Sequence, residues 1–457
     1  MANHHDVPLP LARPPRRWTM RRARALMRSR GPTSLLFRRR IAVVTGAIAI
    51  GIVAVLFAGI ADTAGAAFAR YAEAWRWAPL ATTPITFVVL VWLTRRFAPA
   101  ARGSGIPQVM AAREQADFGV GSLIAMRTAV AKIGLTIGAI LSGASVGREG
   151  PTVQLAAAIM AQVHRVFRVP MRASVVIASG AAGVAAAFNT PLAGILFAIE
   201  ELAAAYEQRV TLLVLSLIVV AGIVAQSLSG DYVYFGVVHA TLPLGSALVV
   251  VPVAGLVGGL AGGLFARLMM AVASPRHAIT GVARRRPLAM AGGCGIVVAA
   301  LGIGTHGLTW GTGYGAAQAM LSGVDAPLWF GPAKFVAALS TAVAGLPGGI
   351  FAPSLAVGAG VGNLLRLPFA DEPARAVVML GMVAYFTGVV RAPLTAVVIL
   401  AETTGSRGLM LPMFATAFIA DWASTRVSAD KLYHSLSRGF VPHADPVTGS
   451  GSSAPLA

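Results

Sequence analysis

The chain repeats itself at a fixed spacing, and this repeat limits the folds open to it more than any other feature. When the sequence is slid against itself by 202 residues, identical residues align without a gap. A looser match pairs G-S-G-I at 103–106 with G-T-G-Y at 311–314. The sequence therefore predicts two halves of one plan, at about 41–230 and 245–430. The aligned residues are Ala131-Lys132 with Ala333-Lys334, Gly143 with Gly345, Gly147 with Gly349, Pro151 with Pro353, Pro191-Leu192 with Pro393-Leu394, and Glu200 with Glu402.

Both halves are too apolar for an ordinary soluble protein. Of 457 residues, 56% are hydrophobic and 12% are charged, against about 45–50% and about 25% in soluble domains. At about 20 apolar residues per span, this composition supplies on the order of ten membrane crossings. The apolar segments lie at about 41–69, 84–98, 123–142, 151–166, 172–188, 191–205, 210–228, 245–272, 287–303, 329–344, 353–367, 375–390, 392–403 and 409–425.

Many of these segments are too short to span a membrane, and 51 glycines and 27 prolines interrupt them. We therefore expect an all-α polytopic membrane protein built from tilted and broken helices. Broken helices are tolerated at membrane depth where the freed backbone is buried in protein or lines a wet cavity. Repeats with interrupted helices are typical of secondary transporters, whose binding site lies near the bilayer midplane. The spacing alone leaves open whether the repeats are parallel or inverted.

The net charge of +20 is concentrated at the N-terminus. Eleven arginines and one acid, Asp6, lie in the first forty residues, which leaves about +10 for the rest of the chain. That remainder shows no basic and aromatic stripe of the kind that binds nucleic acid. We expect residues 1–40 to be a basic, disordered tail that stays in the cytoplasm, where it contacts lipid headgroups or is solvated. Residues 441–457 form a second flexible tail.

Three short stretches combine glycine with a proline placed for the first turn of a helix. The first turn leaves its N–H groups free at the positive end of the helix dipole. Several such ends aimed at one point in a low-dielectric interior bind an anion without a full positive charge. Such a site selects a monovalent anion and still releases it. The stretches are Gly103-Ser104-Gly105-Ile106-Pro107, Gly147-Arg148-Glu149-Gly150-Pro151 and Gly348-Gly349-Ile350-Phe351-Ala352-Pro353.

In this order and spacing, the three stretches resemble those of the CLC family of chloride channels and chloride/proton antiporters, over about residues 41–440. The resemblance implies a CLC-type fold of two inverted-topology repeats, and a homodimer with one pore in each subunit. It implies chloride and protons as substrates and no cofactor. Chloride would be held by Ser104, by the backbone N–H groups of Ile350 and Phe351, and by the hydroxyl of Tyr433. Tyr433 is matched to the family's late pore tyrosine, and its alternative role is that of a tyrosine at the membrane interface.

The resemblance also bears on the choice of anion. Family members that prefer nitrate carry proline where this chain has Ser104, and a hydroxyl donor suits a small spherical anion. Fluoride-exporting relatives depart from the G-S-G-I-P and G-R-E-G-P patterns, which this chain keeps. We therefore expect chloride rather than nitrate or fluoride.

Acidic residues inside membrane segments are costly and are usually functional. Glu200 and Glu402 are repeat partners, which favours a shared packing or capping role. Glu149 and Glu201 have no acidic partner in the repeat, because they align with Phe351 and Thr403. A carboxylate needed once per pore rather than once per repeat has this pattern.

By the resemblance, Glu149 is a gate that occupies the anion site when ionised and swings out when protonated. The residues alone leave an alternative, an acid stabilised by the helix dipole and paired with Arg148. Glu201 matches the glutamate through which exchangers pass protons to the gate from the cytoplasmic side, and which channels replace with an apolar residue. We expect a proton-coupled chloride antiporter, with a passive voltage- or pH-gated chloride channel on the same fold as the alternative.

An enzyme is not expected. Gly143-Ala144-Ser145-Val146-Gly147 fits the G-x-S-x-G pattern, but Ser145 follows an apolar helical run where that motif requires a strand. The single cysteine, Cys294, is interpreted as a small packing residue, and the eight histidines show no metal-ligand spacing. A count of 34 arginines against 3 lysines, without a soluble regulatory domain, favours a prokaryotic protein of the inner (plasma) membrane.

Overall fold

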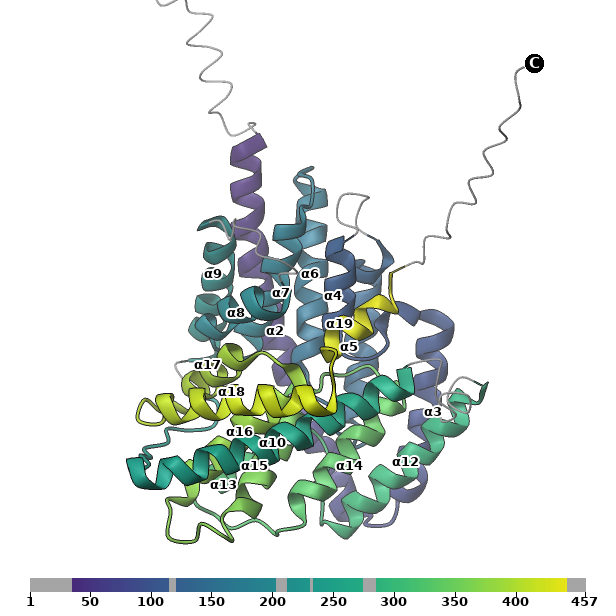
Figure 1. Cartoon of the computed structure of the whole chain (residues 1–457). Coiled ribbons are helices and arrows are strands. Elements are labelled where there is room, and N and C mark those ends of the chain that lie inside the picture. The colour runs from purple at the N-terminus through teal and green to yellow at the C-terminus, as the bar shows by residue number, and fades with distance from the viewer. Residues whose placement is uncertain (1–34, 115–120, 203–211, 231–232, 274–284, 442–457) are drawn as a thin grey trace, which may run out of the picture.

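The computed structural model describes residues 35–114, 121–202, 212–230, 233–273 and 285–441, and throughout these ranges the chain is helical (Figure 1). Their one extended pairing is an isolated antiparallel bridge between Gly147 and Gly349. The predicted all-α class is therefore confirmed. The helices are α2 (Leu35–Ala74), α3 (Pro79–Phe97), η1 (Pro99–Ala101), α4 (Ile106–Glu114), η3 (Ser122–Ile124), α5 (Met126–Ile140), α6 (Glu149–Val166), α7 (Ala173–Phe188), α8 (Pro191–Phe197), η4 (Ala198–Leu202), α9 (Leu212–Ser229), α10 (Leu244–Ala273), α12 (Pro287–Gly304), α13 (Tyr314–Leu321), α14 (Phe330–Val343), α15 (Phe351–Leu365), α16 (Ala374–Val390), α17 (Pro393–Thr404), α18 (Met410–Val427) and α19 (Leu432–Arg438).

The predicted apolar segments correspond closely to these helices. Among the described residues, α2, α3, α10 and α12 are long and apolar enough to cross a membrane, and further apolar helices have 10–17 residues. The helix α2 begins at Leu35, before the predicted tail boundary at residue 40. The rest of that tail, and residues 442–457 at the other end, lie outside the described residues.

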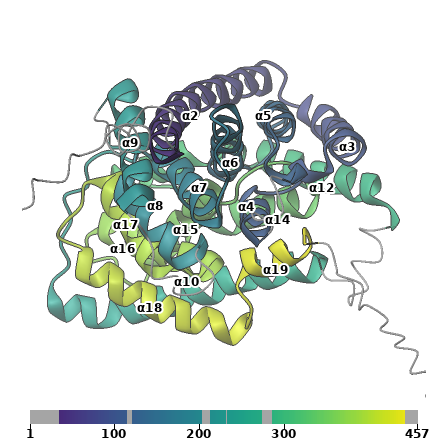
Figure 2. The ribbon, with the colours of Figure 1, turned by 90° about the horizontal axis from the view of Figure 1, so that it is seen from above.

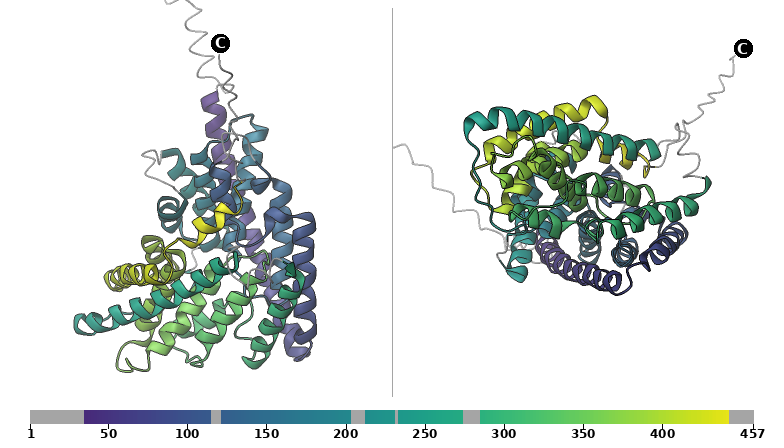
Figure 3. Two further views of the ribbon diagram at one scale, coloured as in Figure 1. Left: turned by 45° about the vertical axis from the view of Figure 1, so that its right-hand side comes forward. Right: turned by 90° about the horizontal axis from the view of Figure 1, so that it is seen from below.

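The helices are strongly tilted with respect to one another. In Figures 1 and 3, α10 and α18 run side by side across the direction of α2 and α6. Seen from above, α2 follows one edge of the molecule and α18 the opposite edge, with α6, α7 and α15 between them (Figure 2). The helix α16 is buried from Ala376 to Val390 and forms the centre of the core. It is apolar on all sides, as a fully enclosed helix must be.

The two repeats are inverted, which the spacing of the sequence had left open. The helices α6 and α15 begin just after Gly147 and Gly349, and these two glycines exchange backbone hydrogen bonds of 2.7 Å each. From this shared point α6 extends into the upper half of Figure 1 and α15 into the lower half. The starts of equivalent helices from the two repeats therefore face each other.

Glu200 and Glu402 cap helices of the opposite repeat. The Glu200 carboxylate accepts hydrogen bonds from the backbone N–H and the hydroxyl of Thr395, both at 2.6 Å, near the start of α17. The Glu402 carboxylate accepts a hydrogen bond from the N–H of Ala193, at 2.8 Å, near the start of α8. These N–H groups are among those that a helix start leaves free. The predicted shared capping role of the two glutamates is confirmed.

Removing either cap is expected to lower stability without removing transport by the folded protein. Glu402→Ala removes the acceptor of the N–H groups of Leu192 and Ala193 at the start of α8, at a cost of about 1 kcal/mol. Thermal unfolding in detergent should show a midpoint several degrees below that of the wild type, and Glu200→Ala should behave alike. The control is Glu114→Ala, because that carboxylate is half exposed and lies 3.6 Å from its partner Arg113. A midpoint for Glu402→Ala equal to that of the control would contradict the capping role.

A candidate anion site where two helix starts meet

Three glycine-rich turns, distant in sequence, meet inside the molecule. The bridge between Gly147 and Gly349 joins the starts of α6 and α15. The N–H of Gly348 donates to the carbonyl of Gly103 at 3.1 Å, which brings the turn before α4 to the same place. Because each helix start carries free N–H groups and the positive end of a dipole, this point attracts an anion without a formal charge.

Glycine is required at this junction by close approach and by backbone conformation. A Cβ atom on Gly150 would overlap the hydroxyl oxygen of Ser104. Gly105 has a φ of +117°, which favours glycine, and a Cβ there would overlap the carbonyl of Gly150. The prolines of the three stretches lie in the first turns of α4, α6 and α15, where they were predicted: Pro107, Pro151 and Pro353.

Two fully buried lysines hold equivalent turns in the two repeats. Lys132 on α5 donates to the carbonyl of Gly103 at 2.6 Å. Its repeat partner, Lys334 on α14, donates to the carbonyls of Thr309 and Gly311 at 2.9 and 2.7 Å. Lys132 thereby fixes the turn that carries Ser104. The two lysines align the repeats in the sequence, but their hydrogen bonds to the glycine turns were not predicted. A lysine at the same position in both apolar halves was the available signal.

The side chain of Glu149 lies at the junction itself. It is 1% exposed, and its carboxylate lies beside Gly147 and Gly349, close to the backbone N–H of Ala352. Neither carboxylate oxygen makes a hydrogen bond of ordinary geometry with a described residue. Because burying an unpaired carboxylate is costly, this position indicates a function rather than a contribution to stability.

Arg148, the neighbour of Glu149, pairs with another acid. Its Nη1 atom lies 2.6 Å from a carboxylate oxygen of Asp62 on α2 and donates to the carbonyl of Ala58 at 2.8 Å. The sequence left open that Arg148 forms an ion pair with Glu149, and no such ion pair is found among the described residues. Asp62 was missed from sequence, although an acid inside the 40-residue helix α2 was a signal.

The hydroxyls of Ser104 and Tyr433 are side by side near the junction. Tyr433, near the start of α19, is fully buried, with its hydroxyl next to Ser104 and within electrostatic range of Glu149 and Glu201. Apart from their contact with each other, neither hydroxyl has a hydrogen-bond partner among the described residues. Buried hydroxyls normally have further partners, so two donors side by side fit an anion that both bind. This burial is inconsistent with the alternative role of Tyr433 at the membrane interface.

Ile350 and Phe351 form the cap and the first residue of α15, so their N–H groups are among those left free. The Phe351 ring packs against the rings of Phe386 and Tyr433, with centroid distances of 5.0 and 5.9 Å. This packing fixes the start of α15 relative to the tyrosine hydroxyl.

Glu201 lies in η4 and is fully buried. Its two oxygens meet side chains from the start of α19, the Nζ of Lys431 at 3.4 Å and the Nδ1 of His434 at 3.5 Å. The side chains of Lys431 and His434 are 34% and 36% exposed, so they connect the buried acid to the surface. The sequence reasoning assigned no function to either, although both lie within two residues of Tyr433.

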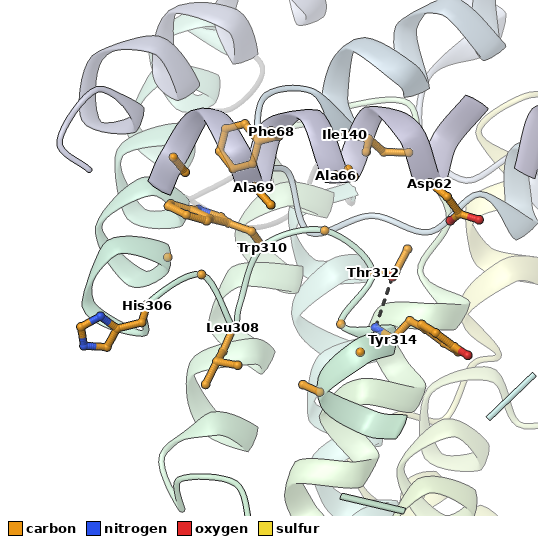
Figure 4. Close-up of a pocket in the computed structure, with 18 of the residues that line it drawn as sticks. Asp62, Ala66, Phe68, Ala69, Ile140, His306, Leu308, Trp310, Thr312 and Tyr314 are labelled. Atoms are coloured by element: carbon orange, nitrogen blue, oxygen red, sulfur yellow. Dashed lines mark hydrogen bonds between the residues drawn. The ribbon is translucent and has the colours of Figure 1, made fainter. Parts of the chain in front are cut away.

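A cavity of about 1080 Å³ reaches the site from the other direction. Figure 4 shows its wall, on which Phe68 of α2 faces Trp310, and Asp62 lies further along α2 on the side of Tyr314. Arg148 also lines it, so the cavity ends one residue from Glu149. The cavity thus brings open space to the residue that precedes Glu149 in the chain.

Ser145 does not form part of a hydrolase site. It precedes α6, whereas His164 lies near the other end of that helix, about 20 Å away at 1.5 Å per residue. The Nδ1 of His164 is bonded to the carbonyl of Met160 at 3.0 Å. Within the described ranges no three metal-binding side chains form a group, and Cys294 is a buried free cysteine of α12.

Gly150→Ala is expected to weaken anion binding, because the added Cβ displaces the Ser104 hydroxyl. Loss of one such contact corresponds to about a tenfold rise in the Kd for chloride, measurable by titration calorimetry in detergent. The matched control is Gly134→Ala on α5, where a Cβ meets no atom within 4 Å. If both variants bind chloride like the wild type, Ser104 is not a ligand.

Comparison with known proteins gives concordant results. The family described as "Voltage gated chloride channel" matches residues 85–425. The H(+)/Cl(-) exchange transporter ClcA of Klebsiella pneumoniae is 31% identical over 435 residues, which cover 90% of each chain. The crystal structure of a slow cyanobacterial Cl-/H+ antiporter superimposes with a TM-score of 0.75 at 23% identity, over 88% of this chain and 98% of that one. A CLC-type fluoride/proton antiporter gives a TM-score of 0.73 at 22% identity, over 87% and 96% of the two chains.

Proposed function

The chain belongs to the family of voltage gated chloride channels, and on that premise we propose that it exchanges chloride for protons across the membrane that it spans. The observation that carries the proposal is the buried, unpaired carboxylate of Glu149 at the joined starts of α6 and α15. As a member of this family the chain is a multi-pass membrane transport protein rather than an enzyme. The relative from Klebsiella pneumoniae, named as an H(+)/Cl(-) exchange transporter, supports the same activity.

Chloride binds between the hydroxyls of Ser104 and Tyr433 and the first N–H groups of α15, those of Ile350 and Phe351. The support is the pair of buried hydroxyls that lie side by side next to a helix start. Helix starts and hydroxyls hold a monovalent anion without a fixed charge, so the ion also leaves readily. The remaining residues of the site shape this backbone: Gly103, Gly105, Pro107, Gly147, Arg148, Gly150, Pro151, Gly349 and Pro353.

Glu149 acts as the gate because its carboxylate, close to the N–H of Ala352, competes with chloride for the free N–H groups at the start of α15. Ionised, it occupies the junction between Gly147 and Gly349, where the structure has it. Protonated, it loses its attraction to the helix starts and leaves the position to chloride. Each cycle of the side chain then carries a proton in one direction and admits an anion in the other.

Glu201 supplies the second proton step, toward the opposite side. The cavity reaches Arg148, next to Glu149, whereas Glu201 meets the part-exposed side chains of Lys431 and His434 at the start of α19. Two buried acids reached from opposite sides favour coupled exchange over a passive channel. The hydroxyl of Ser104 favours chloride over nitrate, and the intact G-S-G-I-P and G-R-E-G-P stretches favour chloride over fluoride.

We further propose a homodimer with one pore per subunit, in a bacterial inner membrane. The basic tail would lie in the cytoplasm, since arginine clusters remain on that side of a first membrane helix. The start of α2 lies at the top of Figure 1, so that face of the molecule is then the cytoplasmic one. The membrane domain covers about residues 41–440, with tails before and after it.

Exchange is tested in liposomes that contain the purified protein. An outward chloride gradient should drive uptake of protons against their own gradient. Glu149→Ala should retain chloride flux and lose both proton coupling and pH dependence, because no carboxylate remains to compete. Glu201→Ala should impair proton movement alone. Chloride flux without proton uptake in the wild type would favour the channel, and intact coupling in Glu149→Ala would refute the gate.

The tyrosine hydroxyl is tested by Tyr433→Phe, which keeps the ring packed on Phe351. Chloride affinity should fall about tenfold, the effect of one lost hydrogen bond to an ion. The matched control is Tyr385→Phe, because Tyr385 is also fully buried with an unpartnered hydroxyl but lies among the rings of Phe265 and Phe335. Equal affinities for the two variants would remove Tyr433 from the site.

A further inference from the structure

We propose that His434 is the group through which Glu201 exchanges protons with the solution, an inference that rests on the proposed exchange function. The carboxylate of Glu201 is fully buried, and its Oε1 lies 3.5 Å from the Nδ1 of His434. That distance is slightly beyond a hydrogen bond, and a small rotation of the imidazole closes it. With 36% of its side chain exposed, His434 meets both the buried acid and the surface.

Histidine suits this step because an unperturbed imidazole gains or loses its proton between about pH 5 and 8. The second contact of Glu201, the Nζ of Lys431, lies 3.4 Å from the other carboxylate oxygen and donates to the carbonyl of Glu200 at 3.3 Å. Lys431 therefore holds the carboxylate in position, whereas His434 delivers and removes the proton.

The neighbouring helices bring no competing acid to His434. The elements packed on α19 are α4, α10 and α16. On α4, Arg113 pairs with Glu114 and donates to the carbonyl of Leu202. At the end of α16, Arg391 pairs with Asp421 at 3.3 Å and donates to the carbonyl of Ala429, just before α19, at 2.8 Å. Arg102 donates to the carbonyl of Gly439 at the other end of α19. Among the described residues, Glu201 is the acid in ion-pair range of His434.

The transfer balances without any other reactant. The imidazolium of His434 gives the proton on Nδ1 to Oε1 of Glu201, which leaves a neutral imidazole with a proton on Nε2 and a neutral carboxylic acid. A flip of the ring then turns the nitrogen without a proton toward the solution, where a hydronium ion gives it a proton, becomes water and restores the imidazolium. In the reverse direction, the acid returns its proton to Nδ1 and the ring releases a proton to water.

The test uses the full chain in liposomes, with chloride and proton fluxes followed together. His434→Gln keeps size and polarity but cannot carry a proton, so proton flux should fall about tenfold and lose its dependence on pH between about 5 and 8. His434→Ala should be equally slow, and millimolar imidazole in the buffer should restore its proton flux. The matched control is His239→Gln, an exposed histidine away from the site.

Each result decides between a proton carrier and a structural role. If the wild type exchanges and the proton flux of His434→Gln matches it, the proposal is overturned. The proposal is also overturned if imidazole fails to restore the proton flux of His434→Ala. A wild type that moves no protons against their gradient overturns the exchange function, and this inference with it.

Discussion

The whole site depends on one contact, the pair of backbone hydrogen bonds that joins Gly147 to Gly349. This contact places the positive ends of α6 and α15 at one point inside an apolar protein. There the free N–H groups act with little screening by water. The first repeat alone would lack the start of α15 and the N–H groups of Ile350 and Phe351. The inverted repeat is therefore the means by which a chain with few buried charges brings these helix starts together at the proposed anion site.

Residues shared by both repeats support the frame, and residues found in one repeat carry the proposed chemistry. Lys132 and Lys334 each hold a glycine turn, and Glu200 and Glu402 each cap a helix of the other repeat. These roles are needed twice because the frame has two equivalent halves. A transport path has two different ends, so a proton carboxylate cannot be duplicated by the same symmetry. Glu149 and Glu201 align with Phe351 and Thr403 for this reason.

The helices and the meeting of the three glycine stretches could be predicted from sequence, because hydropathy, proline and glycine act locally. The side-chain partners could not, because they come from distant segments. Nothing in the sequence near Arg148 indicates that its acid is Asp62, on another helix. The basic tail dominated the net charge of the sequence, although the charges that shape the site are a few buried residues. Local patterns thus locate the backbone of the site better than its ion pairs.

The helix α19 links the two ions more closely than the acids alone would. Its seven residues carry Tyr433 against Ser104 and His434 against Glu201. Because the two side chains are neighbours on one short helix, the proposed chloride site and the proposed proton path share this element. In the proposed exchange, a displacement of α19 would change the distance from the tyrosine to the anion and from the histidine to the acid together. In an exchanger such a link is useful, because a proton that enters while no chloride is bound dissipates the gradient.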